Sequence, residues 1–241
     1  MKYAVFSDVH GNLEAFKAAL DVYYREKVDH YIFLGDIVGY GAEPKECLSR
    51  LKELKAVVVA GNHDWAVSGK FPANNLNIYA REAIFWTQKR LKKEDLAYLD
   101  KFSLTVEEKD FICVHGSLKS PHEFDYIFDL DDASVNFNFL QKKICFIGHT
   151  HRPGIYCQGD DKISYIEQLE IRLEPGKRYI VNVGSVGQPR DGDPRASFCI
   201  YDDEAESLQI IRVGYDVAKS ASAILNQGLP AMLANRLYDG R

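Results

Sequence analysis

Short apolar runs alternate with segments of helical periodicity in the first part of the chain, and this alternation constrains the fold more than any other feature of the sequence. Residues 3–6, 30–34 and 56–60 have the length and composition of buried strands. The first two runs are each followed by a loop and then by apolar residues spaced three or four apart. Strands joined by helical crossovers lie parallel in one sheet, with their carboxyl ends along a shared edge. Ligands of such sheets bind at that edge.

The second half of the chain has a different character. Residues 77–99 are expected to be helical, with Phe85 and Trp86 in the helix core, and two strand-like runs follow. Beyond His151, short β-like stretches separated by glycine, proline and acidic turns predict mostly antiparallel strands, before a last helix at residues 217–225. The strand-like segments are residues 111–114, 144–147, 155–156, 163–166, 170–173, 179–183, 196–201 and 207–213. With neither a linker nor a repeat, residues 1–241 are predicted to form one α/β domain.

Polar side chains follow the predicted strands at the points where the strands end. Five separate strand ends thus deliver aspartate, histidine and asparagine side chains to one edge. These residues are Asp8 and His10, Asp36, Asn62 and His63, His115, and His149 with His151. In an extended loop, residues two apart project to the same side, so Asp8 and His10 are expected to reach one ion.

This mixture of nitrogen and oxygen donors predicts a transition-metal site. Imidazole suits manganese, iron, zinc or nickel, whereas magnesium and calcium prefer shells made of oxygen. Two divalent ions are expected, because the donors outnumber the four to six that one ion holds. Each residue taken alone could instead have a purely structural role: Asn62 could merely cap a helix, and a lone histidine is usually structural. We expect such a structural role for His30 and His122, which lie outside any motif.

Charge points to an anionic substrate at a local site. Two divalent ions beside the carboxylates of Asp8 and Asp36 leave the site electropositive, and two ions can clamp a phosphoryl group for in-line displacement. The net charge of −5 and the pI near 5.8 give no general attraction to long nucleic acids or to anionic membranes. No membrane span or signal sequence is recognisable, and the five cysteines show no close pairs. We therefore expect a cytoplasmic protein with reduced, buried thiols.

The polar segments resemble the five ordered sequence blocks of the calcineurin-like metallophosphoesterases. Later residues, in Asn182-Val183-Gly184-Ser185-Val186-Gly187-Gln188-Pro189-Arg190, and the stretch from Gly35 to Gly41 resemble a small prokaryotic branch of that superfamily. The blocks are Asp8-Val9-His10-Gly11-Asn12, Gly35-Asp36, Gly61-Asn62-His63-Asp64, His115-Gly116 and Gly148-His149-Thr150-His151.

The resemblance implies a four-layer α/β/β/α sandwich and assigns a role to each block. Asp8, His10 and His151 would hold one metal ion, and Asn62, His115 and His149 the other. Asp36 would bridge both ions, and a metal-bound hydroxide would attack the phosphorus. His63 would face the scissile phosphate and either protonate the leaving oxygen or stabilise its developing charge.

One departure from the wider superfamily weakens a protein phosphatase interpretation. Protein serine/threonine phosphatases continue the glycine-aspartate pair with an acidic residue and an arginine, but here Gly39 and Tyr40 occupy those positions. The departure also removes one partner for His63, which leaves the orientation of its imidazole open.

Substrate contacts are expected mainly from the segment 184–190. Its glycines permit close approach of the backbone to a ligand, and Arg190 offers a guanidinium suited to phosphate oxygens. Tyr40, Arg152 and Arg195 are weaker candidates. The expected reaction is hydrolysis of a phosphomonoester, phosphodiester or phosphoanhydride, with a small nucleotide among the candidate substrates. The alternative is a binding scaffold of the same fold that has metals but no turnover.

Overall fold

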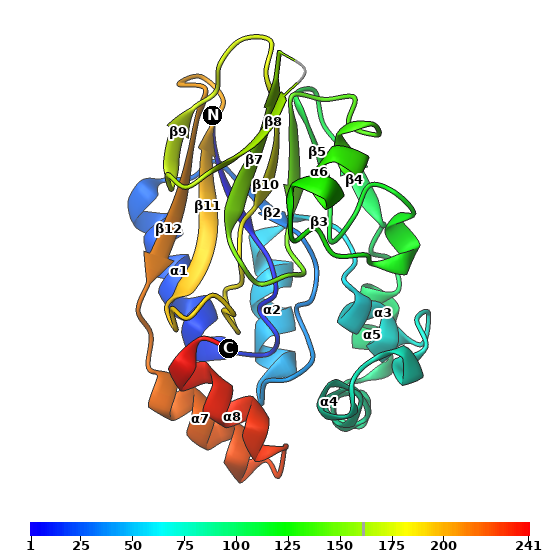
Figure 1. Ribbon diagram of the computed structural model, residues 1–241. Helices are drawn as coiled ribbons and strands as arrows, with labels where there is room; N and C mark the ends of the chain where they lie inside the picture. Colours follow the sequence, from blue (N-terminus) through cyan, green and yellow to red (C-terminus); the bar gives the residue numbers. More distant parts are fainter. Residues whose placement is uncertain (161) are drawn as a thin grey trace.

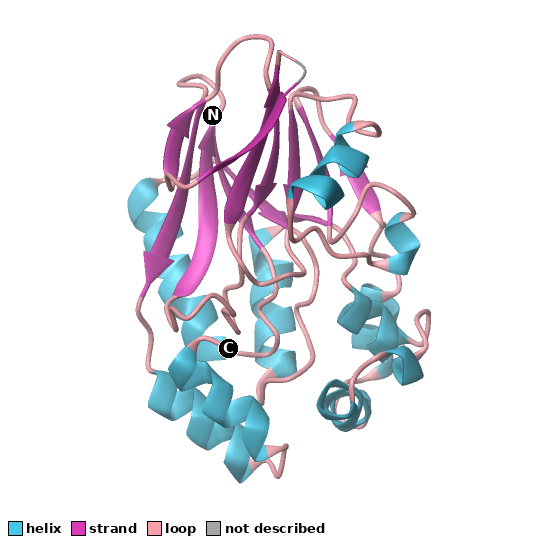
Figure 2. Ribbon diagram, in the orientation of Figure 1, coloured by secondary structure: helices cyan, strands magenta, loops and turns pink. Residues whose placement is uncertain are grey.

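The computed structural model describes residues 1–160 and 162–241, and two six-stranded sheets facing each other dominate it (Figures 1 and 2). The first sheet has the order β3-β2-β1-β11-β12-β9 and the second the order β4-β5-β6-β10-β7-β8. The first contains β1 (Lys2–Phe6), β2 (His30–Phe33), β3 (Val57–Val58), β9 (Glu170–Arg172), β11 (Ala196–Asp202) and β12 (Ser207–Val213). The second contains β4 (Thr105–Glu107), β5 (Phe111–Val114), β6 (Ile144–Ile147), β7 (Gly154–Gly159), β8 (Lys162–Ile166) and β10 (Arg178–Asn182).

Helices cover the outer faces of both sheets. The predicted α/β/β/α sandwich is therefore confirmed. The helices are α1 (Leu13–Glu26), α2 (Pro44–Leu54), α3 (Asn62–Ser68), α4 (Ile78–Gln88), α5 (Lys93–Leu99), α6 (Leu130–Phe137), α7 (Val217–Asn226) and α8 (Ala231–Asp239), with short 3-10 turns at Ala73–Asn75 and Pro121–Glu123. None of the helices in the described ranges is long and apolar enough to cross a membrane.

Side-chain alternation along the strands builds the layers. In β1, Ala4 and Phe6 face the cluster that contains the apolar side of α1, whereas Val5 faces the second sheet. A third cluster lies on the other face of the second sheet, where Phe137 of α6 packs with Ile180 of β10. Because neighbouring residues of a strand point to opposite faces, both faces of each sheet are covered.

The parallel strands of both sheets end at the same edge of the molecule. β1, β2 and β3 pair in parallel in the first sheet, and β5, β6 and β10 do so in the second. The remaining pairs, which include β11 with β1 and β7 with β10, are antiparallel. Loops from the two sheets meet at this edge, where the amide of Gly187 donates a 2.9 Å hydrogen bond to the carbonyl of Asp8. The parallel first part and the mainly antiparallel second part are as predicted.

Several expected boundaries were wrong. Residues 77–99 form two helices, α4 and α5, separated by a turn, and the third strand is reduced to Val57–Val58. Phe85 is 47% exposed because α4 turns Ala80, Ala83 and Ile84 inward instead. The helix at Val217–Asn226 is not the last one, since α8 follows it, and α6 was also not predicted.

The two C-terminal helices, α7 and α8, pack near the carboxyl edge of the first sheet (Figure 1). Ile224 and Leu233 share a buried cluster with Tyr40 and with Ala83 of α4. In addition, the Ser220 hydroxyl donates a 2.8 Å hydrogen bond to the side chain of Asn12, which caps α1. The end of the chain thus contributes to the surroundings of the predicted site.

Candidate metal centre

The loops that carry the predicted ligands adopt a left-handed backbone. Asp8, His10, Asp36, His149 and His151 have φ values of 54°, 50°, 62°, 65° and 59°. Such values are uncommon for residues with a side chain and cluster at functional sites. The amides of Asp8 and His10 hold this conformation by donating 2.9 Å hydrogen bonds to the carbonyls of Gly35 and Asp36. The expectation of an extended loop was therefore wrong, because these interlocked turns, and not an extended strand, aim the side chains.

The turns bring the predicted histidines and aspartates into overlapping groups whose potential ligand atoms lie within 4.8 Å of one another. There are three such groups among the described residues, and all their members are buried. Asp36 belongs to two of these groups. The groups are Asp8 with His10 and His151, Asp36 with His115 and His149, and His10 with Asp36 and His63. Residues from both sheets thus converge on Asp36.

Four buried polar atoms of the predicted metal ligands and His63 have no hydrogen-bond partner within the described structure. They are Oδ1 of Asp8, Oδ1 of Asn62, Nδ1 of His63 and Nε2 of His115. A buried polar atom without a partner is costly, so such atoms call for an explanation. Carboxylate and amide oxygens and an imidazole nitrogen are all metal ligands, and these side chains therefore fit a bound divalent ion.

Backbone carbonyls orient three of the imidazoles. In each of them the Nδ1–H group donates to a backbone carbonyl. His10 donates to Val38 at 3.0 Å, His115 donates to Leu34 at 2.6 Å, and His151 donates to Gln188 at 2.6 Å. A carbonyl can only accept, so each Nδ1 carries a proton, and in the neutral ring each Nε2 then presents its lone pair to an ion. Metal-binding histidines are commonly held in this way.

The charges in the site are strongly coupled. Burial opposes ionisation of Asp8, but His151 and His115 hold the pKa of its carboxyl well below its usual range. Burial likewise disfavours a charged His115, yet Asp36 and Asp8 raise its pKa to about 9. Burial and the neighbouring His115 lower the pKa of His149. The carboxylates of Asp8 and Asp36, whose pKa values are, despite burial, both lowered by the neighbouring histidines, therefore remain ionised and attract cations at neutral pH.

His63 lies between two aromatic rings at the edge of this group. Its ring centroid is 4.8 Å from that of His10 and 4.5 Å from that of Tyr40. Burial lowers the pKa of His63 to about 3, although Asp36 acts in the opposite direction. The packing orients the imidazole without the acidic partner that is absent from the sequence, and burial favours its neutral form.

The predicted substrate residues are only partly brought together. Arg190 and Tyr40 line a small cavity of about 90 Å³ with Asp36 and His63, and the Arg190 guanidinium lies 5.5 Å from the Tyr40 ring. Arg152 lies outside this lining and donates to the carbonyl of Arg190 at 2.9 Å. Arg195 is exposed and paired with Asp193, so the structure does not place it at the site.

Comparisons with known proteins agree with this geometry. A profile for the calcineurin-like phosphoesterase superfamily domain matches residues 1–206. The chain belongs to this superfamily. It is thus a metal-dependent phosphoric ester hydrolase, as the sequence blocks predicted.

Individual relatives of this phosphoesterase cover nearly its whole length. An uncharacterised protein of Methanocaldococcus jannaschii is 40% identical, covering 99% of this chain and 98% of its own. A metallophosphoesterase crystal structure from Sphaerobacter thermophilus is 38% identical with a TM-score of 0.89, covering 100% of this chain and 99% of that one. The phosphodiesterase YfcE of Escherichia coli K12 is more distant, 23% identical over 86% of this chain and 91% of its own.

Three residues of the phosphoesterase site were not assigned a role from the sequence. The Asp64 carboxylate accepts from the amides of Asp36 at 2.7 Å and Ile37 at 3.0 Å, so it fixes the turn that carries Asp36. The carbonyl of Gln188 orients His151, and Tyr126 stacks on His149 with 4.1 Å between ring centroids. Asp64 and Gln188 lie inside sequence segments that resemble the family, so their positions could have indicated a role at the site. Tyr126 lies in no such segment, and the sequence gives no indication of its role.

Gly39 offers a test of how the phosphoesterase positions His63. Its φ is +89°, and a Cβ at this position would lie 2.3 Å from Nδ1 of His63. We expect Gly39→Ala to displace the imidazole and lower kcat by about 10- to 100-fold, because small misplacements of a reacting group are costly. The left-handed backbone should also reduce the free energy of unfolding by about 1–2 kcal/mol.

The matched control is Gly69→Ala. Gly69 has a φ of +92° but no atom within 4 Å of an added Cβ. This variant should lose similar stability and keep its kcat, as measured by chemical denaturation and steady-state kinetics. Unchanged kcat in Gly39→Ala would show that the packing against Gly39 does not position His63.

Proposed function

We propose that this chain hydrolyses a small phosphate ester or phosphoanhydride with two divalent transition metal ions. Asp8, His10 and His151 would hold one ion, Asn62, His115 and His149 the other, and Asp36 would bridge them. The single observation that carries the proposal is the position of Asp36, whose carboxylate belongs to a ligand group with His10 and to another with His115 and His149. The two-ion assignment also accounts for the unpartnered atoms of Asp8, Asn62 and His115.

The metal ions, which could be manganese, iron, zinc or nickel, supply charge neutralisation and an activated water when bound. The protein side chains have separate tasks. His63 lines the small cavity and would act on the leaving oxygen. Because burial disfavours the imidazolium form, the ring would act as a neutral imidazole that donates a hydrogen bond from its N–H group. Arg190 lines the same cavity and would bind a phosphate oxygen.

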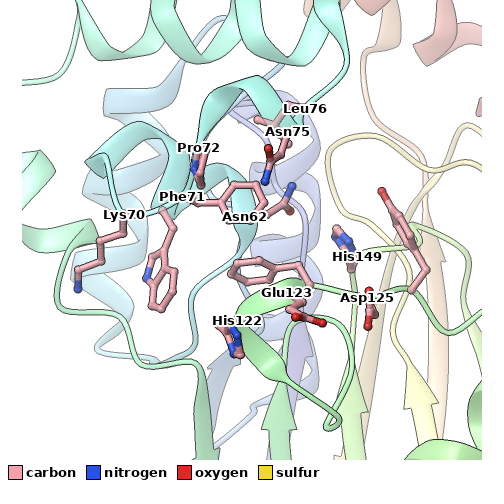
Figure 3. Close-up of a pocket in the computed structure, with 13 residues that line it drawn as sticks. Asn62, Lys70, Phe71, Pro72, Asn75, Leu76, His122, Glu123, Asp125 and His149 are labelled. Atoms are coloured by element: carbon pink, nitrogen blue, oxygen red, sulfur yellow. The ribbon is translucent and has the colours of Figure 1, made fainter.

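A larger pocket suits the organic part of the substrate. It has a volume of about 600 Å³ and combines Asn62 and His149 with the aromatic rings of Trp65, Phe71 and Phe124. Figure 3 shows Asn62 and His149 in its lining, with Lys70 far from His149. The aromatic lining and the limited volume support a small organic phosphate such as a nucleotide. The net charge of −5 argues against long nucleic acids.

A scaffold that binds metals without turnover is the alternative. The filled ligand positions and the buried His63 beside them argue against it. Turnover of p-nitrophenyl phosphate and bis(p-nitrophenyl) phosphate by purified protein with added Mn²⁺ distinguishes the two functions. Absence of metal-dependent turnover on a wide range of phosphate esters and anhydrides would favour the scaffold.

Metal content tests the two-ion site directly. We expect elemental analysis to find close to two transition ions per chain, because the three ligand groups exceed the capacity of one ion. Removal of the ions should also lower Tm, since they bind only the folded site. A fully active protein with a single ion or with magnesium alone would contradict the two-ion site.

We further propose that residues 1–241 form one domain and that the protein acts in the cytoplasm. Support for one domain comes from Tyr40, which shares a buried cluster with Ile224 of α7 and Leu233 of α8, beyond the segment matched by the family. Support for the cytoplasm comes from the five cysteines, which are all buried and free.

A further inference from the structure

Arginine side chains surround a further cavity beside the metal centre. This arginine cavity has a volume of about 670 Å³ and is lined by Arg152, Arg190, Arg236 and Arg241, together with Asp191 and Gly192. Arg190 also lines the small cavity that contains Asp36 and His151, so the two cavities adjoin at this side chain. Arg236 and Arg241 lie beyond residue 206, outside the segment matched by the family.

Gln188 holds two of these guanidinium groups side by side. Its Oε1 accepts a 2.8 Å hydrogen bond from Nη2 of Arg190 and a 3.2 Å bond from Nη1 of Arg236. Gln188 is itself buried, and its backbone carbonyl orients the imidazole of His151. A single residue therefore connects the metal centre with the arginine cavity.

The arginine cavity has fewer acidic groups than guanidinium groups. Within residues 1–160 and 162–241, no aspartate or glutamate forms an ion pair with Arg152, Arg190, Arg236 or Arg241. The only acidic residue of the lining, Asp191, is paired with Arg212. Nε of Arg190 is buried without a hydrogen-bond partner. Burial and the charge of Arg190 also lower the pKa of Arg236. Nε of Arg236 donates to the main-chain carboxyl oxygen of Arg241. The four guanidinium groups still outnumber the acidic groups beside them, and a bound anion would relieve their mutual repulsion.

We propose that the arginine cavity binds a second phosphate group of the substrate, beyond the phosphoryl group at the metal centre. This inference rests on the proposed function and narrows it to compact compounds with two or more phosphates. Guanidinium groups match phosphate oxygens in shape and charge, and Arg190, shared by both cavities, would contact the bridge between the phosphates. A monophosphate of a neutral alcohol would leave Arg236 and Arg241 without a partner.

The test measures how affinity depends on phosphate chain length. Methylphosphonate, methylenediphosphonate and bis(methylene)triphosphonate, whose P–C bonds a phosphoesterase does not hydrolyse, are titrated calorimetrically into the metal-loaded full-length protein, with the same excess of Mn²⁺ in cell and syringe. In the wild type, affinity should rise at least about tenfold from the monophosphonate to the triphosphonate, because charge-assisted hydrogen bonds are added. Arg236→Gln and Arg241→Gln should each remove most of this gain. Arg241→Gln serves as a second variant, since Arg236 also contacts Gln188 and the main-chain carboxyl oxygen of Arg241.

Arg195→Gln is the matched control, because Arg195 is an exposed arginine that is paired with Asp193 and lies outside the arginine cavity. It should keep the full gain in affinity. A wild type without the gain, cavity variants that retain it, or an equal loss in Arg195→Gln would each overturn the inference. Turnover of p-nitrophenyl phosphate is measured on the same samples. Its absence would count against the proposed function, whereas the length dependence of anion binding tests the arginine cavity separately.

Discussion

Asp36→Asn is expected to lower kcat by at least about 10³-fold and to reduce the metal content. The substitution keeps the size of the side chain and an oxygen that can accept the 2.8 Å hydrogen bond from the amide of His63, so the fold should survive. It removes the negative charge that two ligand groups share. A bridging carboxylate contributes several kcal/mol to holding and spacing two ions, which corresponds to the predicted loss in rate.

Asp129→Asn provides the control for the charge change. Asp129 caps α6 by accepting from the amide of Asp132, and asparagine caps a helix equally well. This variant should bind the same amount of metal as the wild type and show the same kcat. Kinetics, elemental analysis and circular dichroism on both variants are needed. If Asp36→Asn retained near-normal kcat and metal content, Asp36 would not bridge the ions.

His63→Ala is expected to lower kcat by about 10²–10⁴-fold while both metal ions stay bound. His63 would act on the leaving oxygen, so the loss should be largest for an alkyl ester and smallest for p-nitrophenyl phosphate, whose leaving group is a stable anion. The buried ring, with its pKa near 3, favours hydrogen-bond donation from the neutral form. His63→Gln retains an N–H donor and should therefore recover part of the lost rate.

His149→Ala distinguishes this role from that of a ligand. His149 belongs to the group with Asp36 and His115, and its loss should release metal. kcat on an aryl and an alkyl ester and metal content are measured for all three variants. Equal losses on both esters with intact metal would eliminate an interaction with the leaving group. Loss of an ion from His63→Ala would instead make His63 a ligand, which its proximity to His10 and Asp36 permits geometrically.

The sheet edge and the polar side chains gathered there could be predicted because they depend on local signals. The apolar run before Asp8 and the glycine-aspartate pair at Asp36 mark strand ends, and parallel strands necessarily bring such ends together. The same pattern did not reveal the backbone that aims the side chains. Left-handed φ values at Asp8 and His149 result from hydrogen bonds between loops distant in sequence, such as the 3.0 Å bond from the His149 amide to Asp8 Oδ2.

Tertiary contacts determine the positions of several residues that could not be placed from the sequence. Phe85 has the apolar character of a core residue, but the small side chains of Ala80 and Ala83 form the packed face of α4. Tyr126 belongs to no motif and reaches the site only because its loop places the ring on His149. The role of Arg236 depends on α8, whose position against Tyr40 has no local signature. Such residues become recognisable only after the chain has folded.

The dispersal of the ligands over both sheets also determines when the site can form during synthesis. Asp8 emerges from the ribosome early, but its partner His151 follows β6, and Gln188, which orients His151, follows β10. An N-terminal fragment that ends before β6 lacks part of each proposed ion site, so with these ligands a nascent chain of that length would be inactive. Catalytic competence would then arise only after β10 has been synthesised and the two sheets have joined.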